Sequence, residues 1–309
     1  MKNNFIRVIL AVLIFTLCLA LFSCTEDRIT KIKLGKETIR IGTKNFTEQK
    51  IWGYVLKNLI EENTDYIAEV VSFGGTGLVF NALKNGDIDM YCEYTGTMYS
   101  ALLLGTKPKD RIFKPKEIYE LTKTGMNDNF DILVLDPIGF ENNYALCVSE
   151  KTMKKYNLET ITNLIPYAEK MKHTGSFEWM EREDGLIALK NTYGINFLES
   201  FPIESGLMYD ALLYENVDCV AAFSTDGEIL KYNLKLLKDD GNALLSYYLC
   251  PIISEGFAIA LPEVKEAINM LSGKITSEMM QEFNLMFEEN DLHYNDVAVA
   301  ILRKNGIMN

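Results

Sequence analysis

The sequence predicts an α/β fold made of two similar lobes, because two regularities run through the chain. Segments that alternate like strands, such as residues 66–73 and 88–94, are followed by amphipathic segments with helical spacing. Such alternation is typical of the α/β class. One helix–strand unit also recurs at a constant offset of 129 residues. A chain of 309 residues is long enough to bury the cores of two lobes.

The first unit begins with a strand at residues 38–42, where apolar and polar residues alternate. Apolar residues then recur at helical spacing over residues 51–60, and Thr47 is the expected N-cap of this helix. After the strand at residues 66–73, a second amphipathic helix is predicted to end near Gly86, because glycine is a common helix terminator.

The recurring unit places an aromatic residue at the carboxyl end of a strand in each half of the chain. Residues 81–95 and 210–224 correspond without a gap, and the aromatic residues are Tyr94 and Phe223. Ligands bind at this edge of open α/β sheets, so both rings are candidates for a binding site. Two ordinary helix–strand units that match by chance are the alternative explanation.

The chain is expected to cross twice between the lobes. A strand resumes at Gly139, and residues 251–253 would return to the first lobe. The predicted lobes are residues 38–138 with 252–309, and residues 139–251. Three helices are expected at the end of the chain and would pack on the first lobe: residues 263–272, 276–290 and 294–304.

The first 23 residues have the pattern of a secretory signal, in which two basic residues precede an apolar run at residues 8–22. This run is too short for a comfortable membrane span. It ends in Leu-Phe-Ser-Cys, which resembles a lipobox, so Cys24 is expected to carry a lipid after residues 1–23 are removed. Residues 24–37 would then be a tether. A buried cysteine after an ordinary signal peptide is the alternative.

The composition argues against several classes of function. A formal net charge of −12 is unfavourable for a partner such as nucleic acid or anionic lipid. Neither Gly-x-Ser-x-Gly nor His-Glu-x-x-His occurs, so no catalytic residue and no cofactor are expected. His173 and His293 lack metal-ligand spacing, so no metal site is expected, and both are expected at the surface.

Four cysteines follow Cys24 and are far apart in the sequence, with apolar neighbours typical of strands. Buried free thiols are the favoured interpretation, although disulfides are permitted outside the cell. The four residues are Cys92, Cys147, Cys219 and Cys250.

Eight short stretches occur in one order and resemble the substrate-binding proteins of osmoprotectant ABC transporters, the glycine betaine, choline and carnitine group. They begin at Ile41, Gly74, Gly86, Glu93, Asn142, Glu181, Phe223 and Tyr247, and include Ile-Gly-Thr-Lys-Asn-Phe-Thr-Glu-Gln and Glu-Tyr-Thr-Gly-Thr. The resemblance covers residues 38–306. It implies a type II periplasmic-binding-protein fold with a ligand cleft between the lobes, and a permease and an ATPase as partners.

The resemblance also implies an aromatic cage around a quaternary ammonium group. Such a nitrogen has no N–H to donate, whereas aromatic faces attract its diffuse charge by about 0.5–2 kcal/mol each. By position the cage would consist of Tyr94, Tyr144, Phe223 and Tyr247. Tyr248 is adjacent to Tyr247 and could take its role. Family members commonly have tyrosine at the position of Phe223.

The resemblance also assigns residues to the methyl groups of the ligand and to a carboxylate at its opposite end. The backbone carbonyl of Asn142 could touch the methyl groups, whereas Lys44, Thr97 and Arg182 would meet a carboxylate. A surface ion pair with an acidic neighbour is the alternative role for Arg182.

The resemblance therefore implies an extracytoplasmic, lipid-anchored solute-binding protein of an importer. Glycine betaine is the favoured ligand, and choline or carnitine is the alternative. A surface sensor on the same scaffold or a secreted hydrolase is more remote.

Overall fold

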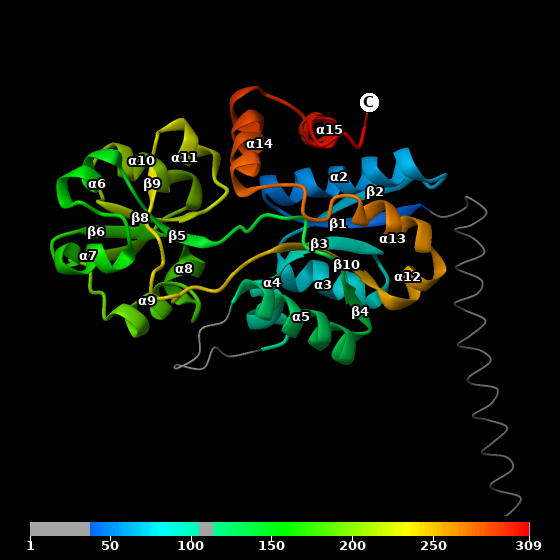
Figure 1. The fold of residues 1–309 in the computed structure, drawn as a ribbon, viewed down its shortest axis with the longest axis horizontal. Helices are drawn as coiled ribbons and strands as arrows, with labels where there is room; N and C mark the ends of the chain where they lie inside the picture. Colours follow the sequence, from blue (N-terminus) through cyan, green and yellow to red (C-terminus); the bar gives the residue numbers. More distant parts are fainter. Residues whose placement is uncertain (1–37, 105–113, 309) are drawn as a thin grey trace, which may run out of the picture.

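The computed structural model describes residues 38–104 and 114–308 and contains two lobes that lie side by side (Figure 1). Each lobe is built around a five-stranded sheet with helices on both faces. This arrangement confirms the predicted α/β class and the prediction of two lobes. The predicted signal sequence, the tether and Cys24 lie outside the described residues.

The sheet of the first lobe takes in strands from distant parts of the chain. Its strands are β1 (Ile39–Lys44), β2 (Ala68–Phe73), β3 (Met90–Tyr94), β4 (Ile132–Val134) and β10 (Leu249–Ser254). The order is β2-β1-β3-β10-β4. β1 is parallel to β2 and β3, whereas β10 is antiparallel to β3 and β4. Because β1 and β3 are parallel, their last residues, Lys44 and Tyr94, lie at the same edge of the sheet.

Helices bury apolar faces against both sides of this sheet. They are α2 (Thr47–Asn63), α3 (Thr76–Asn85), α4 (Thr95–Thr97), the π-helix η1 (Met98–Leu102), α5 (Pro115–Phe130), α12 (Glu255–Ala260), α13 (Pro262–Asn269), α14 (Ser277–Glu289) and α15 (Tyr294–Lys304). In α2 the fully buried Ile51, Val55 and Leu59 recur at the spacing that the sequence predicts. The predicted cap of α2 is wrong by one residue, because Phe46 occupies the N-cap position and Thr47 is the first helical residue.

The second lobe has the same general plan. Its strands are β5 (Tyr144–Val148), β6 (Lys172–Gly175), β7 (Glu199–Pro202), β8 (Cys219–Phe223) and β9 (Lys235–Leu236), in the order β7-β6-β8-β5-β9. Its helices are α6 (Glu150–Tyr156), α7 (Ile161–Ala168), α8 (Phe177–Glu181), α9 (Leu186–Tyr193), the 3-10 helix η2 (Ser205–Leu207), α10 (Met208–Leu213) and α11 (Gly227–Lys231). The helices again enclose two apolar clusters, one on each face of the sheet.

The repeat predicted from the sequence is confirmed in the fold. α3 leads into β3 in the first lobe, and α10 leads into β8 in the second. Tyr94 is the last residue of β3, and Phe223 is the last residue of β8. Each lobe therefore places one aromatic ring at the carboxyl end of an inner strand.

Two chain segments connect the lobes, residues 135–143 and residues 237–248. They meet at an antiparallel bridge between Glu141 and Tyr248. The backbone N–H of Asn142 also donates to the carbonyl of Tyr247 at 3.1 Å. β10 pairs with β3 from Leu249 onward, and the predicted lobe boundaries at residues 138 and 252 stay a prediction.

The closing helices do more than complete the first lobe. α13 and α15 pack against α2, as expected, but α14 packs against α11 of the second lobe (Figure 1). This contact depends on the absence of a side chain at Gly227, because a Cβ there would lie 2.7 Å from the backbone nitrogen of Leu285. α14 therefore bridges the two lobes.

The four described cysteines are free and buried, which confirms the favoured interpretation. Cys92 and Cys250 lie on paired strands, but their register differs by one residue and they belong to different apolar clusters. Cys147 and Cys219 show the same offset. Because successive side chains alternate between the faces of a sheet, the thiols of each pair point to opposite faces and cannot form a disulfide.

The surface position predicted for His173 is wrong, whereas that of His293 is correct. His173 is fully buried on β6, where its ring stacks on Phe197 with centroids 4.5 Å apart. Its Nε2 accepts a hydrogen bond of 3.2 Å from Nε1 of Trp179. Burial lowers the pKa of His173 to about 3.

Within the described part of the chain, none of the helices combines the length and apolar character needed to cross a membrane.

Candidate functional site

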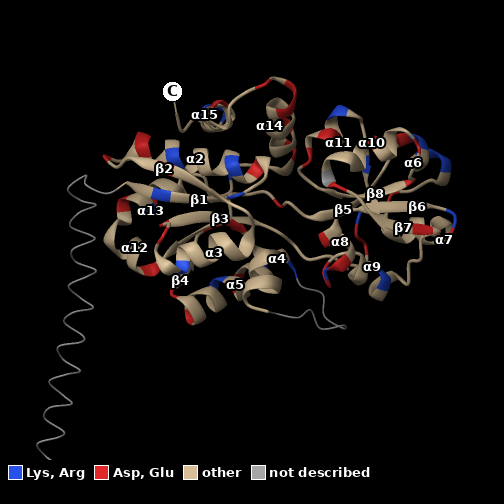
Figure 2. Cartoon of the chain, turned by 180° about the vertical axis from the view of Figure 1, so that it is seen from behind, with Lys and Arg blue, Asp and Glu red and all other residues tan. Residues whose placement is uncertain are grey.

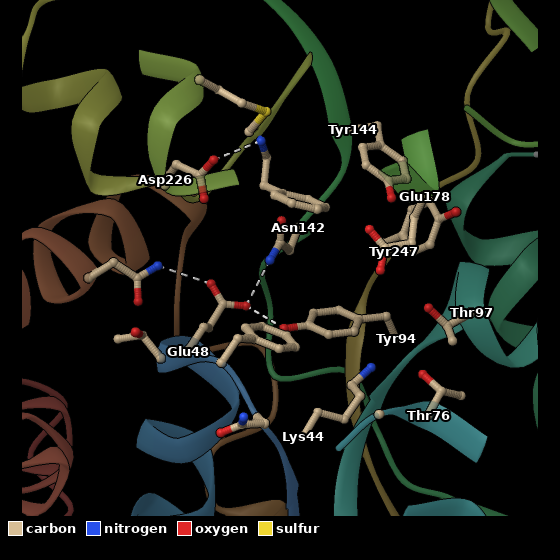
Figure 3. Close-up of a pocket in the computed structure, with 18 of the residues that line it drawn as sticks. Lys44, Glu48, Thr76, Tyr94, Thr97, Asn142, Tyr144, Glu178, Asp226 and Tyr247 are labelled. Atoms are coloured by element: carbon tan, nitrogen blue, oxygen red, sulfur yellow. Dashed lines mark hydrogen bonds between the residues drawn. The ribbon is translucent and has the colours of Figure 1, made fainter. Parts of the chain in front are cut away.

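A cavity of about 680 Å³ lies between the two lobes (Figure 3). All eight residues that the sequence predicts for a ligand line this cavity: Lys44, Tyr94, Thr97, Asn142, Tyr144, Arg182, Phe223 and Tyr247. Their convergence from distant segments is a property of the fold. Their contacts with a ligand stay a prediction.

The topology explains this convergence. Lys44, Tyr94 and Thr97 come from the carboxyl ends of β1 and β3 and from the turn of helix that follows β3. In the second lobe, Tyr144 begins β5 and Phe223 ends the neighbouring antiparallel strand β8. Arg182 directly follows α8. Asn142 and Tyr247 lie on the two connecting segments, so both lobes and the hinge contribute to the cavity.

Three aromatic rings, two from the second lobe and one from a connecting segment, form a corner in the cavity wall. Tyr144 and Phe223 are register partners, and their rings stack with centroids 4.9 Å apart and planes inclined by 29°. The ring of Tyr247 stands nearly perpendicular to Tyr144, at 6.1 Å. Trp179 supports Tyr144 from the core, with centroids 5.0 Å apart. The corner therefore presents ring faces and edges that are held by packing.

Tyr94 lies on the first-lobe side and stacks on Phe46, with ring centroids 6.5 Å apart. Phe46 also lines the cavity and was missed in the sequence, although it directly precedes α2. The ammonium of Lys44 is 4.8 Å from the centroid of the Tyr94 ring, within the range of a cation–π interaction. One protein cation thus already lies close to this ring.

Lys44 also forms a buried ion pair, with 2.5 Å between its Nζ and Oε1 of Glu93. Glu93 is fully buried and additionally accepts hydrogen bonds from the backbone N–H of Tyr94 and the hydroxyl of Tyr91. The pair satisfies both buried charges, so the positive charge that Lys44 presents to the cavity is partly neutralised.

Arg182 makes a two-pronged ion pair with Asp184, in which Nε and a terminal nitrogen each lie 2.7 Å from a carboxylate oxygen. A pair with an acidic neighbour, the alternative role of Arg182, is therefore observed, but Asp184 is buried and Arg182 also lines the cavity. Burial opposes ionisation of Asp184, but the hydrogen bonds from Arg182 nevertheless bring the pKa of Asp184 below its usual value. Asp184 also interacts with Tyr247 and with Ser100 of the first lobe.

The structure separates Tyr247 from its neighbour Tyr248. Tyr247 lines the cavity, whereas Tyr248 packs against a different apolar cluster of the first lobe. Tyr247 lies directly against the backbone at Gly96, where a Cβ would approach its ring to 2.6 Å. A glycine at this position is thus required for the ring to occupy its place in the wall.

Glu48 lies in the first turn of α2 and was also missed, although it belongs to one of the stretches that carry the resemblance. Its carboxylate is almost completely buried and accepts four side-chain hydrogen bonds. Those from Tyr94 and Asn142 are visible in Figure 3. The donors come from both lobes, from one connecting segment and from α14.

Further acidic residues line the cavity: Glu178, Asp226 and Glu228 from the second lobe, and Glu288 from α14. No motif in the sequence indicates them. Figure 2 shows acidic positions on α8, α11 and α14, the helices that carry Glu178, Glu228 and Glu288. Burial raises the pKa of Asp226 to about 7, and burial together with the charge of Glu228 raises that of Glu288 to about 7.

Among the described side chains, five acidic and two basic ones line the cavity. Asp226 and Glu288, with pKa values of about 7, are only partly ionised at neutral pH, but the other acidic groups still outnumber the basic ones and favour a cation in the site. In residues 38–104 and 114–308, no group of His, Cys, Asp and Glu side chains is arranged to hold a metal ion.

Comparisons with known proteins agree with this geometry. Residues 37–304 match the OpuAC family, described as the substrate binding domain of ABC-type glycine betaine transport system. The chain is 36% identical over 308 residues to the carnitine transport binding protein OpuCC of Listeria monocytogenes, covering 99% of this chain and 98% of that protein.

Two further matches extend the comparison. The ergothioneine transport permease/ergothioneine binding protein EgtU of Helicobacter pylori is 28% identical over 280 residues, which cover 90% of this chain and 50% of that protein. A crystal structure named as a glycine betaine/carnitine/choline ABC transporter superposes with a TM-score of 0.80 at 33% identity, over 88% of this chain and all of that one. This superposition confirms the predicted periplasmic-binding-protein fold.

Proposed function

The chain belongs to the family of substrate-binding domains of ABC-type glycine betaine transport systems, and we propose that its cavity captures a carboxylated quaternary-ammonium compound. It is a substrate-binding protein of an ABC importer for osmoprotectants, and not an enzyme. Members of this family work on the extracytoplasmic side of the membrane and have a permease as partner.

One observation carries the proposal, namely that Tyr94, Tyr144, Phe223 and Tyr247 line a single cavity. A quaternary nitrogen offers no hydrogen to donate, and its diffuse charge is attracted by ring faces. The stacked pair and the perpendicular Tyr247 supply such surfaces from the second lobe and the hinge. Tyr94 adds a ring from the first lobe, so a bound cation would contact both lobes.

A carboxylate at the other end of the ligand would meet Lys44, Thr97 and Arg182. Among the residues that the structure describes, Lys44 and Arg182 are the basic residues that line the cavity, and they belong to opposite lobes. A ligand that bridges them binds more tightly to the closed arrangement of the lobes, and this differential affinity would drive closure.

Glycine betaine is the ligand that we favour, and carnitine is the alternative among carboxylated compounds. The volume of about 680 Å³ leaves room for the longer carnitine. The Listeria relative, whose name refers to carnitine, supports this alternative.

Choline is a second candidate that a separate observation favours. Both basic residues of the cavity are already paired with carboxylates, Lys44 with Glu93 and Arg182 with Asp184. Acidic residues also outnumber basic ones in the wall. A ligand with a net positive charge gains from this field, whereas a zwitterion gains less.

Titration calorimetry of the mature domain with glycine betaine, carnitine, choline and proline betaine tests the proposal. We expect a carboxylated compound to bind most tightly, and Tyr94→Ala to weaken it tenfold or more, about 1.4 kcal/mol. Tyr214→Ala is the matched control, because Tyr214 is 76% exposed on the second lobe. Absence of binding to all four compounds, or a Tyr94→Ala variant that binds like the parent, would refute the proposal.

We also propose that a lipid on Cys24 holds the protein at the outer face of the membrane. The Leu-Phe-Ser-Cys sequence supports this anchoring. Acyl chains contribute about 0.8 kcal/mol for each buried CH₂. Cys24→Ser is expected to move the protein from the membrane fraction to the soluble fraction, and a variant that stays in the membrane fraction would contradict the anchor.

A further inference from the structure

Glu48 is a buried acidic group whose hydrogen bonds connect the cavity wall to the rest of the fold. Its Oε1 accepts from the hydroxyl of Tyr94 at 2.6 Å and from Nδ2 of Asn142 at 3.0 Å. Its Oε2 accepts from Oγ1 of Thr225 at 2.7 Å and from Nδ2 of Asn284 at 3.1 Å. Both oxygens of the carboxylate are therefore engaged.

The position of Glu48 at the start of α2 stabilises its charge. The residue is 4% exposed, so an ionised carboxylate needs strong compensation. Four donors provide it, and the positive end of the helix dipole adds to it. The protein itself therefore compensates the charge, and no ligand has to do so.

We propose that Glu48 is a positioning residue for ligand binding, which fixes the ring of Tyr94 and increases the negative charge that this ring offers to a cation. The inference rests on the proposed function, because it concerns the same aromatic cage. Glu48 would act through Tyr94 and not by direct contact with the ligand.

The physical basis is the hydrogen bond from the phenol to the carboxylate. A phenol that donates to an anion gains negative charge on its oxygen and ring, which strengthens attraction between the ring and a cation. Burial and the charge of Glu48 also raise the pKa of Tyr94 well above its usual value. The hydroxyl therefore remains protonated and continues to donate at physiological pH.

The arrangement lets a negative charge act on the ligand without being exposed to it. A carboxylate in direct contact with a quaternary ammonium group would lose water without gaining a hydrogen bond. In the proposed arrangement the ring of Tyr94 would lie between the two charges, and Glu48, which is 4% exposed, would keep its four donors. The carboxylate thus contributes to the field of the cavity at no further cost in desolvation.

A different role for Glu48 is a clasp between the lobes, because Thr225 belongs to the second lobe and Asn284 to α14. The two roles predict different dependence on the hydroxyl of Tyr94. A clasp acts through Thr225 whether or not Tyr94 has a hydroxyl, whereas a positioning residue needs that hydroxyl.

The test is a double-mutant cycle with Glu48→Gln and Tyr94→Phe, read out as affinity for glycine betaine, carnitine and choline. We expect each single variant to lower the affinity for the ligand that binds the parent by about threefold or more. Glu48→Gln should have little further effect in the Tyr94→Phe background. If Glu48→Gln does not fold, Tyr94→Phe decides alone, because it keeps the ring and removes only the hydroxyl.

Two controls complete the design. Tyr66→Phe removes a phenol that also donates to a glutamate, Glu263, but outside the cavity, and it should leave affinity unchanged. Thr225→Val removes only the bond to the second lobe and should weaken binding less than Glu48→Gln.

The outcomes separate the inference from the proposed function. A parent that binds none of the ligands overturns both. A parent that binds, together with a Tyr94→Phe variant of equal affinity, overturns the inference alone. The inference is also overturned if Glu48→Gln lowers affinity equally in the parent and in the Tyr94→Phe background. It is overturned as well if Thr225→Val lowers affinity as much as Glu48→Gln does.

Discussion

Tyr144 and Phe223 are partners on antiparallel strands, and their rings stack with centroids 4.9 Å apart at the wall of the cavity. Each ring therefore restricts the orientation of the other. The pair is the part of the proposed cage that depends most directly on strand register, since a shift by one residue would turn one ring away from the cavity.

The first prediction concerns the aromatic character of Phe223. Phe223→Leu keeps an apolar side chain of similar size but removes the ring face, so affinity for a quaternary-ammonium ligand should fall about two- to thirtyfold. Phe223→Tyr keeps the ring and should bind within about threefold of the parent. Titration calorimetry measures both. Equal affinity of the leucine variant and the parent would show that the ring face is not used.

The second prediction concerns Gly96, which leaves room for the ring of Tyr247. In Gly96→Ala the new Cβ would lie 2.6 Å from that ring, so Tyr247 must move and ligand affinity should fall at least tenfold. Gly256→Ala is the matched control, because a Cβ there meets no atom within 4 Å. The control should bind like the parent. Unchanged affinity in Gly96→Ala would mean that the position of Tyr247 is unimportant for binding.

The third prediction concerns the buried ion pair of Lys44 and Glu93. Lys44→Met leaves the carboxylate of Glu93 buried without its cation, which should lower the free energy of unfolding by about 3–5 kcal/mol. Lys44→Met with Glu93→Gln removes both charges and should recover part of this loss. Urea denaturation measures the three proteins. If the double variant is no more stable than Lys44→Met, the cost does not come from the uncompensated charge.

The fourth prediction concerns the pH dependence of stability. His173 has a folded-state pKa of about 3, against 6.5 for the free side chain, because burial disfavours its charged form. The unfolded chain therefore binds a proton more readily than the folded chain. The stability that neutral His173 contributes is present above about pH 6.5 and is lost as the pH falls toward about 3.

Between about pH 7.5 and about pH 5, His173 should account for a loss of about 2 kcal/mol in the free energy of unfolding. His173→Gln retains an acceptor for Trp179 but does not titrate, so its stability should fall less over this range. Chemical denaturation at several pH values makes the comparison. Parallel curves for parent and variant would contradict a neutral, buried His173.

The sequence predicts the strands and helices of the first unit well, because local patterns determine them. The spacing of apolar residues in α2 is a helical repeat, and Gly86 ends α3 in a left-handed conformation that glycine adopts readily. The start of α2 was less predictable, since Phe46 occupies the N-cap position without a side-chain hydrogen bond.

The burial of His173 could not be predicted from its neighbours in the chain. Its partners Trp179 and Phe197 come from a helix and a loop that pack on β6 only in the folded lobe. The contact of α14 with α11 is of the same kind, because it depends on Gly227 and Leu285, which are far apart in the sequence.

By itself the sequence determined the class of fold and the recurring unit, since these depend on local periodicity. Its resemblance to a known family, carried by short motifs, predicted which aromatic and basic residues belong to the site. Only the tertiary structure decided how these residues are paired. In the folded protein Glu48 accepts a hydrogen bond from Tyr94. Lys44 forms an ion pair with Glu93, and Arg182 forms one with Asp184. The physical reason is that burial and charge compensation depend on groups brought together from separate elements, which no local pattern encodes.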